Sequence, residues 1–217
     1  MTYHKPVLLQ QAVAGLVIKP KGVYVDATFG GGGHSKAILE KIDATAKLFG
    51  FDHDSEAAKN SLEDQRFTFL GSNFKNIKAY LQYNKIKMVD GILADLGVSS
   101  HQFDTGHRGF STRIDGPLDM RMNLDQPLDA KTIVNEYSED ELERIFKEYG
   151  EVDRAKKFAT DIINERQRTT IETTFQLRGL LVKKIPKRFE NKVLAQCFQA
   201  LRIEVNGELE ALKSLLK

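Results

Sequence analysis

Three aspartates stand where short apolar segments end, and the first of them leads into a run of glycines. Asp26 opens the stretch DATFGGGGH, Asp52 closes LFGFD, and Asp95 follows GILA. A glycine loop between a strand and a helix lets the backbone come close to a ligand, and the first turn of the helix offers unpaired N–H groups. A carboxylate that ends a second strand can accept both hydroxyls of a ribose. These residues predict a site for a nucleoside-containing ligand.

The glycine spacing differs from the fingerprint of dinucleotide enzymes. Asp26, Gly30 and Gly32 form D-x-x-x-G-x-G, whereas a pyrophosphate is bound by G-x-G-x-x-G. An acidic residue ahead of the glycines suits a ligand with a cationic or amino-acid end. Asp52 lies 22 residues after Gly30, a spacing that agrees with ribose recognition. Two simpler alternatives stay open: the loop is a turn without a ligand, and Asp52 caps the next helix.

Asp95 is expected beside the first strand, at the crevice where ligands bind in doubly wound sheets. A carboxylate there can face a reacting centre. The alternative is a loop cap formed by Asp95 with Ser99 and Ser100. The glycine-rich segment that follows contains three arginines expected to meet a substrate: Arg108, Arg113 and Arg121.

Hydrophobic periodicity places these residues on an α/β framework. It predicts strands at 23–27, 47–52, 66–70 and 88–93, with helices at 6–16, 35–42, 55–64 and 74–83, an alternation typical of a parallel sheet. A long loop is expected next, and from residue 129 the pattern is helical, at 129–137, 138–149, 151–166, 174–182 and 191–217. The predicted domains are a nucleoside-binding unit at 1–104 and a helical unit at 105–217.

Charge is balanced over the whole chain but not locally. Lys plus Arg number 32 against 30 Asp plus Glu, a net charge of +2. Residues 154–192, in contrast, contain eleven bases and four acids, with Phe158, Phe175 and Phe189 among them. Such a segment can follow a phosphate backbone. The simpler alternative is a solvated helix face with the three phenylalanines in the core.

Composition argues against several other classes of protein. The single cysteine, Cys197, cannot form an internal disulfide and is predicted to be a buried apolar residue. The five histidines show no H-E-x-x-H pair, so no metal site is predicted. The chain begins without a signal-like segment and has no apolar run near the roughly 20 residues that span a bilayer. A cytoplasmic protein with no membrane partner is expected.

Several motifs, spread over almost the whole chain, resemble one protein family. They are YHKPVLL (3–9), VDATFGGGGHS (25–35), GSNF (71–74), DGILADLGVSSHQFD (90–104), RGFS (108–111), PLDMRMN (117–123) and FQALRIEVN (198–206). Runs such as DLGVSSHQFD are far more specific than a lone glycine pattern. In these motifs the chain is similar to the bacterial ribosomal small-subunit RNA methyltransferases of the MraW type.

The resemblance implies a class I, Rossmann-like methyltransferase sheet, interrupted after its fourth strand by a helical domain that recognises the substrate. It implies S-adenosylmethionine as cofactor and methyl transfer to the exocyclic N4 of a cytidine in small-subunit (16S) ribosomal RNA, or in the ribosomal subunit, with Asp95 as the catalytic residue. The implied cofactor contacts are Gly32, Gly33 and His34, then Asp52 for the ribose, Phe74 for the adenine, and Asp95 and Gln102 for the adenosine or methionine side.

Family members continue beyond FQALRIEVN into further strands, whereas this sequence stops at Lys217. A sheet without its last strands exposes an edge, so impaired stability or a homodimer is expected. Two other functions stay open. One is an inactive fragment that binds S-adenosylmethionine or RNA without transfer. The other is a nicotinamide-dependent oxidoreductase, which the position of Asp26 and the missing G-x-x-G after Gly32 disfavour.

Overall fold

The computed structural model describes residues 6–17, 19–183 and 185–217, so YHKPVLL begins outside the described residues. The chain divides into two compact units. One runs up to Ser99 and includes Leu209–Lys217, and the other is Ser100–Glu208. This division differs from the expected 1–104 and 105–217 in two places. The second unit begins earlier because the helix after Ser99 contacts the next helical turn, and the end of the chain belongs with the sheet.

The first unit is built on a parallel four-stranded sheet in the order β3-β2-β1-β4. This arrangement confirms the predicted parallel α/β sheet and places β1 between β2 and β4. Tyr24 and Val25 of β1 are fully buried, as expected for a parallel strand covered on both faces. The strands are β1 Val23–Asp26, β2 Lys47–Phe51, β3 Phe67–Leu70 and β4 Gly91–Leu93.

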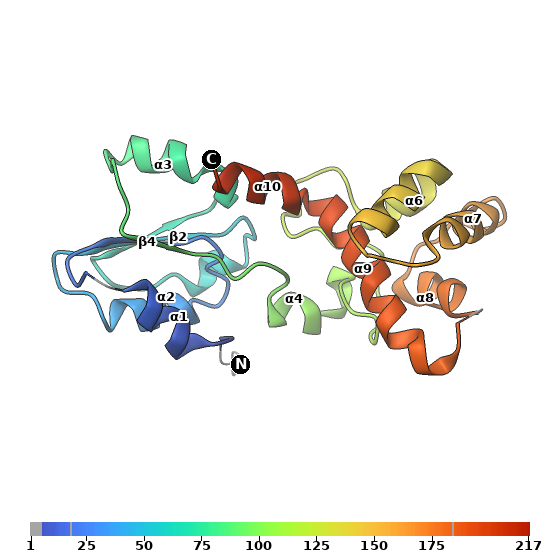
Figure 1. Ribbon diagram of the computed structural model, residues 1–217, viewed down its shortest axis with the longest axis horizontal. Helices are drawn as coiled ribbons and strands as arrows, with labels where there is room; N and C mark the ends of the chain where they lie inside the picture. The colour runs from blue at the N-terminus through green and yellow to red at the C-terminus, as the bar shows by residue number, and fades with distance from the viewer. Residues whose placement is uncertain (1–5, 18, 184) are drawn as a thin grey trace. The chain divides into compact units, whose positions relative to one another are not determined.

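Helices cover both faces of this sheet (Figure 1). On one face, α1 (Leu9–Leu16) and α2 (Gly33–Leu39) pack over an apolar cluster that contains Phe29. On the other, α3 (Ile77–Tyr83) packs over a second cluster, which Leu215 of α10 (Glu208–Leu215) joins. The chain therefore leaves this unit after β4 and returns to it with α10. The helical unit is an insertion in the α/β unit, as the family resemblance implies.

Three local expectations in this unit were wrong. The helix expected at 55–64 shrinks to the 3₁₀ helix η1 (Ala57–Asn60), because this polar segment buries only Ala57 and has no apolar stripe to hold a longer helix. The helix expected at 74–83 begins as the 3₁₀ helix η2 (Phe74–Asn76). Residues 88–90 are not in β4, and Asp90 instead pairs with Lys19 at 2.7 Å.

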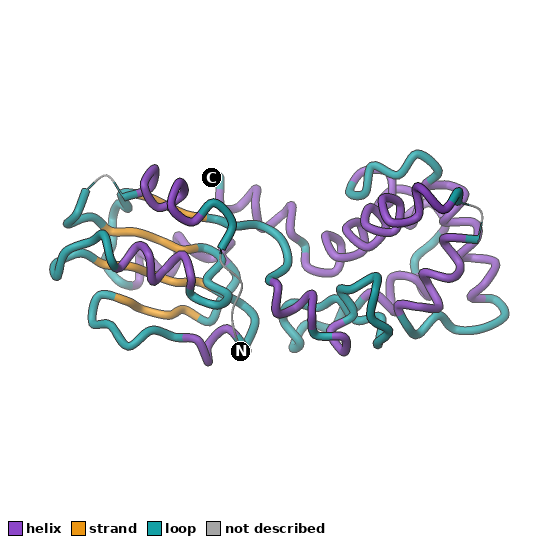
Figure 2. Tube along the Cα trace, turned by 90° about the horizontal axis from the view of Figure 1, so that it is seen from below, coloured by secondary structure: helices purple, strands orange, loops and turns teal. Residues whose placement is uncertain are grey.

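The second unit is helical, and Figure 2 shows strands only in the first unit. Apart from one bridge between Pro117 and Thr173, its described residues form no strand. The helix α9 contacts α5, α6 and α8. The helices are α4 Ser100–Asp104, η3 Gly106–Arg108, α5 Ala130–Glu136, α6 Glu139–Glu148, α7 Ala155–Arg166, α8 Thr174–Val182, η4 Lys187–Phe189 and α9 Glu190–Asn206.

Local signals set several of these helix ends. Ser138 and Glu141 form the predicted capping box at the start of α6, and Thr173 and Gln176 form another at α8. The helix expected at 191–217 is broken at Gly207, whose φ of 57° lies in the left-handed region. The expectation of a long loop after Leu93 was partly wrong, since α4 and η3 lie in it.

Cys197 is fully buried on α9, which confirms its interpretation as a core residue. Burial raises the pKa of its thiol to about 12. In the described part of the chain, no helix has both the length and the apolar character needed to cross a membrane.

Candidate functional site

The carboxyl ends of β1, β2 and β4 bring the predicted aspartates to one edge of the sheet. The register aligns Asp26, the last residue of β1, with Gly50 of β2 and Leu93 of β4. Asp52 and Asp95 each follow those partners by two residues. They therefore lie at the same level, on the two strands that flank β1.

The glycine loop turns sharply between β1 and α2. Gly30 has φ 50° and Gly32 has φ 74°, both in the left-handed region that favours glycine. A Cβ on Gly32 would lie 2.9 Å from the ring of Phe29. That ring is 3% exposed and stacks on Phe67 with 5.2 Å between centroids. Backbone conformation and aromatic packing both require glycine at position 32.

Asp52 holds this loop in place. Its Oδ2 accepts a hydrogen bond from the Gly30 N–H at 2.8 Å, and its Oδ1 accepts one from the Asp54 N–H at 2.9 Å. The helix-cap alternative is wrong, because η1 starts only at Ala57 and has no side-chain cap. Burial raises the pKa of Asp52, and the two N–H donors oppose that rise. Sequence reasoning missed Asn60, whose side-chain amide donates to the Gly30 carbonyl at 3.0 Å.

The side chain of Asp26 is buried and bonds to other residues of the protein. It has no exposed surface, and its carboxylate accepts hydrogen bonds from the Ser35 hydroxyl at 2.7 Å and the Thr28 N–H at 3.2 Å. Burial raises the pKa of Asp26, while these two donors lower it. The direct contact with a cationic ligand end that the glycine pattern favoured is therefore not supported. Asp26 ties the end of β1 to the first turn of α2.

Gly33 and His34 begin α2 under the N-terminal segment of the described chain. A Cβ on Gly33 would collide with the ring of Pro6. His34 is 7% exposed, and its Nε2 lies 3.2 Å from the carbonyl oxygen of Val7. Because a carbonyl only accepts, Nε2 carries a proton. These contacts set the direction of the helix that follows the glycine loop.

A hydrogen-bond chain at the end of β3 sets the protonation of His53. Asn73 Oδ1 accepts the Lys75 N–H at 2.9 Å, so Asn73 Nδ2 donates to His53 Nδ1 at 3.0 Å. Nδ1 is thus an acceptor, and the proton of the neutral ring is on Nε2. Burial lowers the pKa of His53, in agreement with a neutral ring. Phe74 is the residue after Asn73, and it is half-buried against the apolar cluster that contains Ile77.

Asp95 presents an unengaged carboxylate. Its backbone N–H donates to Thr28 Oγ1 at 2.8 Å, which fixes the main chain beside β1. The residue is exposed, and among the described residues its carboxylate makes no hydrogen bond or ion pair. The loop-cap alternative is therefore not supported. A negative charge at this edge is free to accept hydrogen bonds from a ligand.

The remaining predicted residues belong to the second unit. Gln102 lies on α4 and is 6% exposed. Arg108 is 2% exposed and donates to the carbonyl oxygens of Arg121 and Met122, both at 3.0 Å. Arg121 pairs with Asp119 at 2.8 Å. The burial of Arg108 does not support its predicted contact with a substrate, whereas the contact predicted for the partly exposed Arg121 stays a prediction. Arg113 is exposed.

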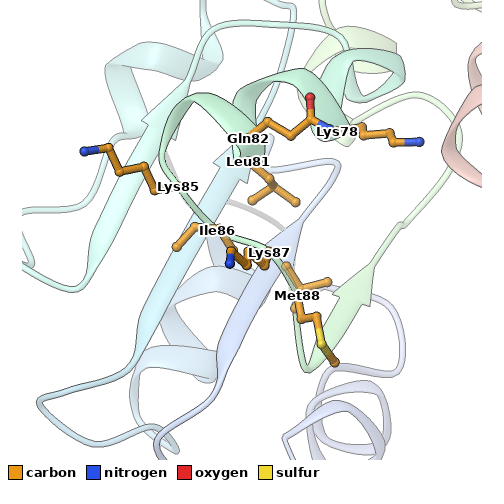
Figure 3. Close-up of a pocket in the computed structure, with 8 residues that line it drawn as sticks. Lys78, Leu81, Gln82, Lys85, Ile86, Lys87 and Met88 are labelled. Atoms are coloured by element: carbon orange, nitrogen blue, oxygen red, sulfur yellow. The ribbon is translucent and has the colours of Figure 1, made fainter.

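A cavity of about 580 Å³ lies elsewhere in the first unit, beside α3 and the segment that leads into β4 (Figure 3). Leu81, Ile86 and Met88 contribute apolar surface, and three lysines line it as well. None of the predicted site residues lines it. It adjoins the segment before β4, whereas Asp95 follows the opposite end of that strand. Among the described residues, no group of three or more His, Cys, Asp and Glu is arranged to hold a metal ion.

Fold and site together define an α/β protein with a parallel sheet and a helical insertion. A glycine loop follows the central strand, a carboxylate follows each neighbouring strand, and the insertion begins after β4. The model of the MraW methylase family matches residues 1–217. The chain belongs to that family, which confirms the resemblance seen in its motifs. This membership contradicts the nicotinamide-dependent alternative.

Several relatives are about 50% identical to this chain over the aligned residues, and each is called Ribosomal RNA small subunit methyltransferase H. The Flavobacterium johnsoniae protein is 53% identical over 217 residues, which is 100% of this chain and 72% of the relative. The Flavobacterium psychrophilum protein is 54% identical over 210 residues, 97% of this chain and 72% of the relative. The Bacteroides thetaiotaomicron protein is 49% identical over 216 residues, 100% and 71% respectively.

Proposed function

We propose that this chain transfers a methyl group from S-adenosylmethionine to the exocyclic N4 of a cytidine in small-subunit ribosomal RNA. The observation that carries the proposal is 53% identity, over all 217 residues, to a relative named as a ribosomal RNA small subunit methyltransferase. The substrate is the RNA itself or the ribosomal subunit that contains it. Such a reaction takes place in the cytoplasm, where ribosomal RNA is found.

The carboxyl edge of the sheet fits an adenosyl cofactor. Each oxygen of Asp52 accepts one backbone N–H and keeps a lone pair for a ribose hydroxyl. Gly32 and Gly33 shape the turn that would contact the cofactor through its backbone, and His34 stands in the first turn of α2. Phe74 offers a half-buried aromatic ring for the adenine. The role of Gln102 rests on the DLGVSSHQFD motif alone.

Methyl transfer to N4 mainly requires that the cytosine be positioned against the methyl group and that a group be present to accept the N4 proton. When bound, S-adenosylmethionine supplies a sulfonium methyl group that is already activated. The lone pair of cytosine N4 is delocalised into the ring, so N4 is a poor nucleophile until its N–H bonds find an acceptor. The unengaged carboxylate of Asp95 can accept such a hydrogen bond and then take the proton as the carbon–sulfur bond breaks and the N4–carbon bond forms. The target base must leave its stack to reach this carboxylate.

Asp95→Asn tests the proposed proton acceptor. Transfer of radiolabelled methyl to small-subunit RNA should fall by about 10²- to 10⁴-fold, the usual contribution of general base catalysis. The affinity for S-adenosylmethionine, measured by calorimetry, should change far less. Asp125→Asn, at an exposed carboxylate of the second unit, is the matched control and should transfer normally. Undiminished transfer by Asp95→Asn contradicts the assigned role.

The alternative is a chain that binds without catalysis. It predicts that the wild-type chain binds S-adenosylmethionine in the calorimeter but transfers no methyl group to RNA. The proposed function predicts both binding and transfer. The two measurements, made on the same preparation, therefore separate the enzyme from the binding fragment.

A further inference from the structure

The basic segment 154–192 carries two phenylalanines that the structure exposes. Phe175 on α8 is 41% exposed and Phe189 at the end of η4 is 44% exposed, whereas Phe158 on α7 is 3% exposed. The alternative that placed all three rings in the core is therefore wrong for two of them. The exposed part of each ring forgoes the free energy that its burial would contribute, since that free energy scales with the apolar area removed from water. Both rings are available to a partner.

An arginine guanidinium lies over each of these two exposed rings. The Arg178 guanidinium carbon lies 5.5 Å from the ring centroid of Phe175, and that of Arg188 lies 4.6 Å from the centroid of Phe189. Both distances are within cation–π range. Arg178 also donates to the Thr112 carbonyl at 3.3 Å, which limits its movement. Aromatic rings and planar guanidinium groups are the surfaces on which proteins stack unpaired RNA bases.

Positive charge near these rings is not neutralised. Lys187 and Lys192 are exposed, and among the described residues neither makes an ion pair. Lys183 reaches Glu165 only at 4.0 Å. Arg166, in contrast, is committed to structure, since it donates to the carbonyl oxygen of Tyr137 at 2.6 Å. The lysines of η4 and α9 are therefore free to contact phosphates.

The backbone beneath Phe175 is rigid. Its N–H donates to Asp115 Oδ1 at 3.1 Å. The fully buried Thr174 donates its hydroxyl to the Ile114 carbonyl at 3.0 Å. With the capping box at Thr173, these bonds fix the first turn of α8. A ring presented from a fixed backbone loses little conformational entropy when a partner binds.

We propose that α8, η4 and the start of α9 form a docking surface for single-stranded RNA. Bases stack on the Phe175–Arg178 and Arg188–Phe189 pairs, while phosphates contact Lys187 and Lys192. The inference rests on the proposed function, because the RNA substrate of that reaction is the partner that occupies the surface. Positive charge alone would attract an acidic protein equally well. Two exposed aromatic rings under guanidinium groups favour RNA.

The stacking part is tested in the full chain with the double variant Phe175→Ala, Phe189→Ala. Fluorescence anisotropy measures affinity for a labelled single-stranded fragment of small-subunit RNA. Each lost stack should weaken binding by about 5- to 150-fold. Phe175→Tyr with Phe189→Tyr keeps both rings and should bind as wild type. Tyr83→Ala removes an aromatic ring that is 86% exposed on α3, outside the surface, and should bind normally.

Three results would overturn the stacking part. They are wild-type affinity of the double alanine variant, an equal loss in the tyrosine variant, and an equal loss in Tyr83→Ala. Melting followed by circular dichroism confirms that each variant is folded at the temperature of the assay.

The charge part is tested by salt dependence. Lys187→Gln with Lys192→Gln should reduce the slope of log affinity against log salt by about 1.4, since each phosphate contact on a single strand contributes about 0.7. Lys85→Gln with Lys87→Gln, two exposed lysines of the first unit, should leave the slope unchanged. Equal slopes in all three proteins contradict the proposal. So does competition by polyglutamate as strong as that by unlabelled RNA, which would identify an acidic protein as the partner.

RNA binding is read without catalysis, so the two proposals fail separately. Normal methyl transfer together with unchanged RNA affinity in the phenylalanine variants removes the docking surface and leaves the proposed function. RNA binding that depends on these residues, in a chain that transfers no methyl group, removes the proposed function and supports the surface.

Discussion

Asp52→Asn tests whether one carboxylate both shapes the glycine loop and binds the cofactor. The two oxygens of Asp52 accept the N–H groups of Gly30 and Asp54, at 2.8 and 2.9 Å. An asparagine keeps one acceptor oxygen and replaces the other with an NH₂ group. One backbone N–H then loses its acceptor, and the bond that remains is no longer to a charged group.

These contacts set the expected size of the effect. A hydrogen bond to a charged group contributes about 1.5–3 kcal/mol and one to a neutral group about 0.5–1.5 kcal/mol. Because Asp52 is partly exposed, water replaces some of the loss, and we expect the free energy of unfolding to fall by about 2 kcal/mol. A ribose hydroxyl loses its charged acceptor as well. Affinity for S-adenosylmethionine should fall by about 30- to 160-fold, equivalent to about 2–3 kcal/mol.

Urea unfolding measures the first quantity and titration calorimetry the second. Asp43→Asn is the matched control, because Asp43 Oδ1 accepts both the N–H and the hydroxyl of Thr45, at 2.9 and 2.8 Å, in the segment before β2. It removes the same charge at the other end of that strand and should leave cofactor affinity unchanged. The reasoning is refuted if Asp52→Asn binds S-adenosylmethionine as tightly as wild type, or if Asp43→Asn weakens it equally.

Four further predictions follow from the structure. Gly32→Ala should lower the unfolding free energy by about 2–4 kcal/mol, because φ is positive and the Cβ meets Phe29. A Cβ on Gly15 of α1 would have no atom within 4 Å, so Gly15→Ala should raise the unfolding free energy by about 0.5–1 kcal/mol. Equal urea midpoints for the two variants would contradict both expectations. Burial lowers the pKa of His53 from 6.5. As the pH falls, the imidazole of His53 is therefore protonated at a higher pH in the unfolded chain than in the folded one. Wild type should therefore lose stability relative to His53→Gln as pH falls below 6.5, and a pH-independent difference counts against this. Cys197, buried with a pKa of about 12, should react with thiol reagents at mildly alkaline pH only as the chain unfolds in urea. The homodimer predicted from an exposed sheet edge stays a prediction, and a monomer at every concentration in sedimentation would contradict it.

Local sequence patterns correctly predicted the helices and strands that are determined by residues close together in the sequence. The alternation of apolar segments predicted four parallel strands, and Ser138 with Glu141 predicted the start of α6. The DATFGGGGH stretch and the carboxylate of Asp52 were placed correctly, because a glycine loop and a strand end each have a short-range signature. Helix periodicity failed at 55–64, where Ala57 is the one buried apolar residue and Leu62 packs only in part against the core.

Such patterns could not predict contacts between residues that are far apart in the sequence. Arg108 and Arg113 stand in one loop of similar composition, yet one is buried against main-chain carbonyls and the other is exposed. Phe158 and Phe175 lie in the same basic segment, yet only the first enters the core. Periodicity describes one element at a time, whereas exposure depends on which other elements pack against it.

The amino-acid sequence by itself determined the family, the parallel sheet, the glycine loop and the aspartates that end its neighbouring strands, because each is encoded over a few adjacent residues or in specific motifs. Only the tertiary structure decided that Asp26 faces inward, that the Asp52 oxygens hold the loop, that Asp95 is unengaged and that two arginine-stacked phenylalanines stay in solvent. Those outcomes depend on long-range packing and hydrogen bonding, which bring together side chains that lie tens of residues apart in the chain.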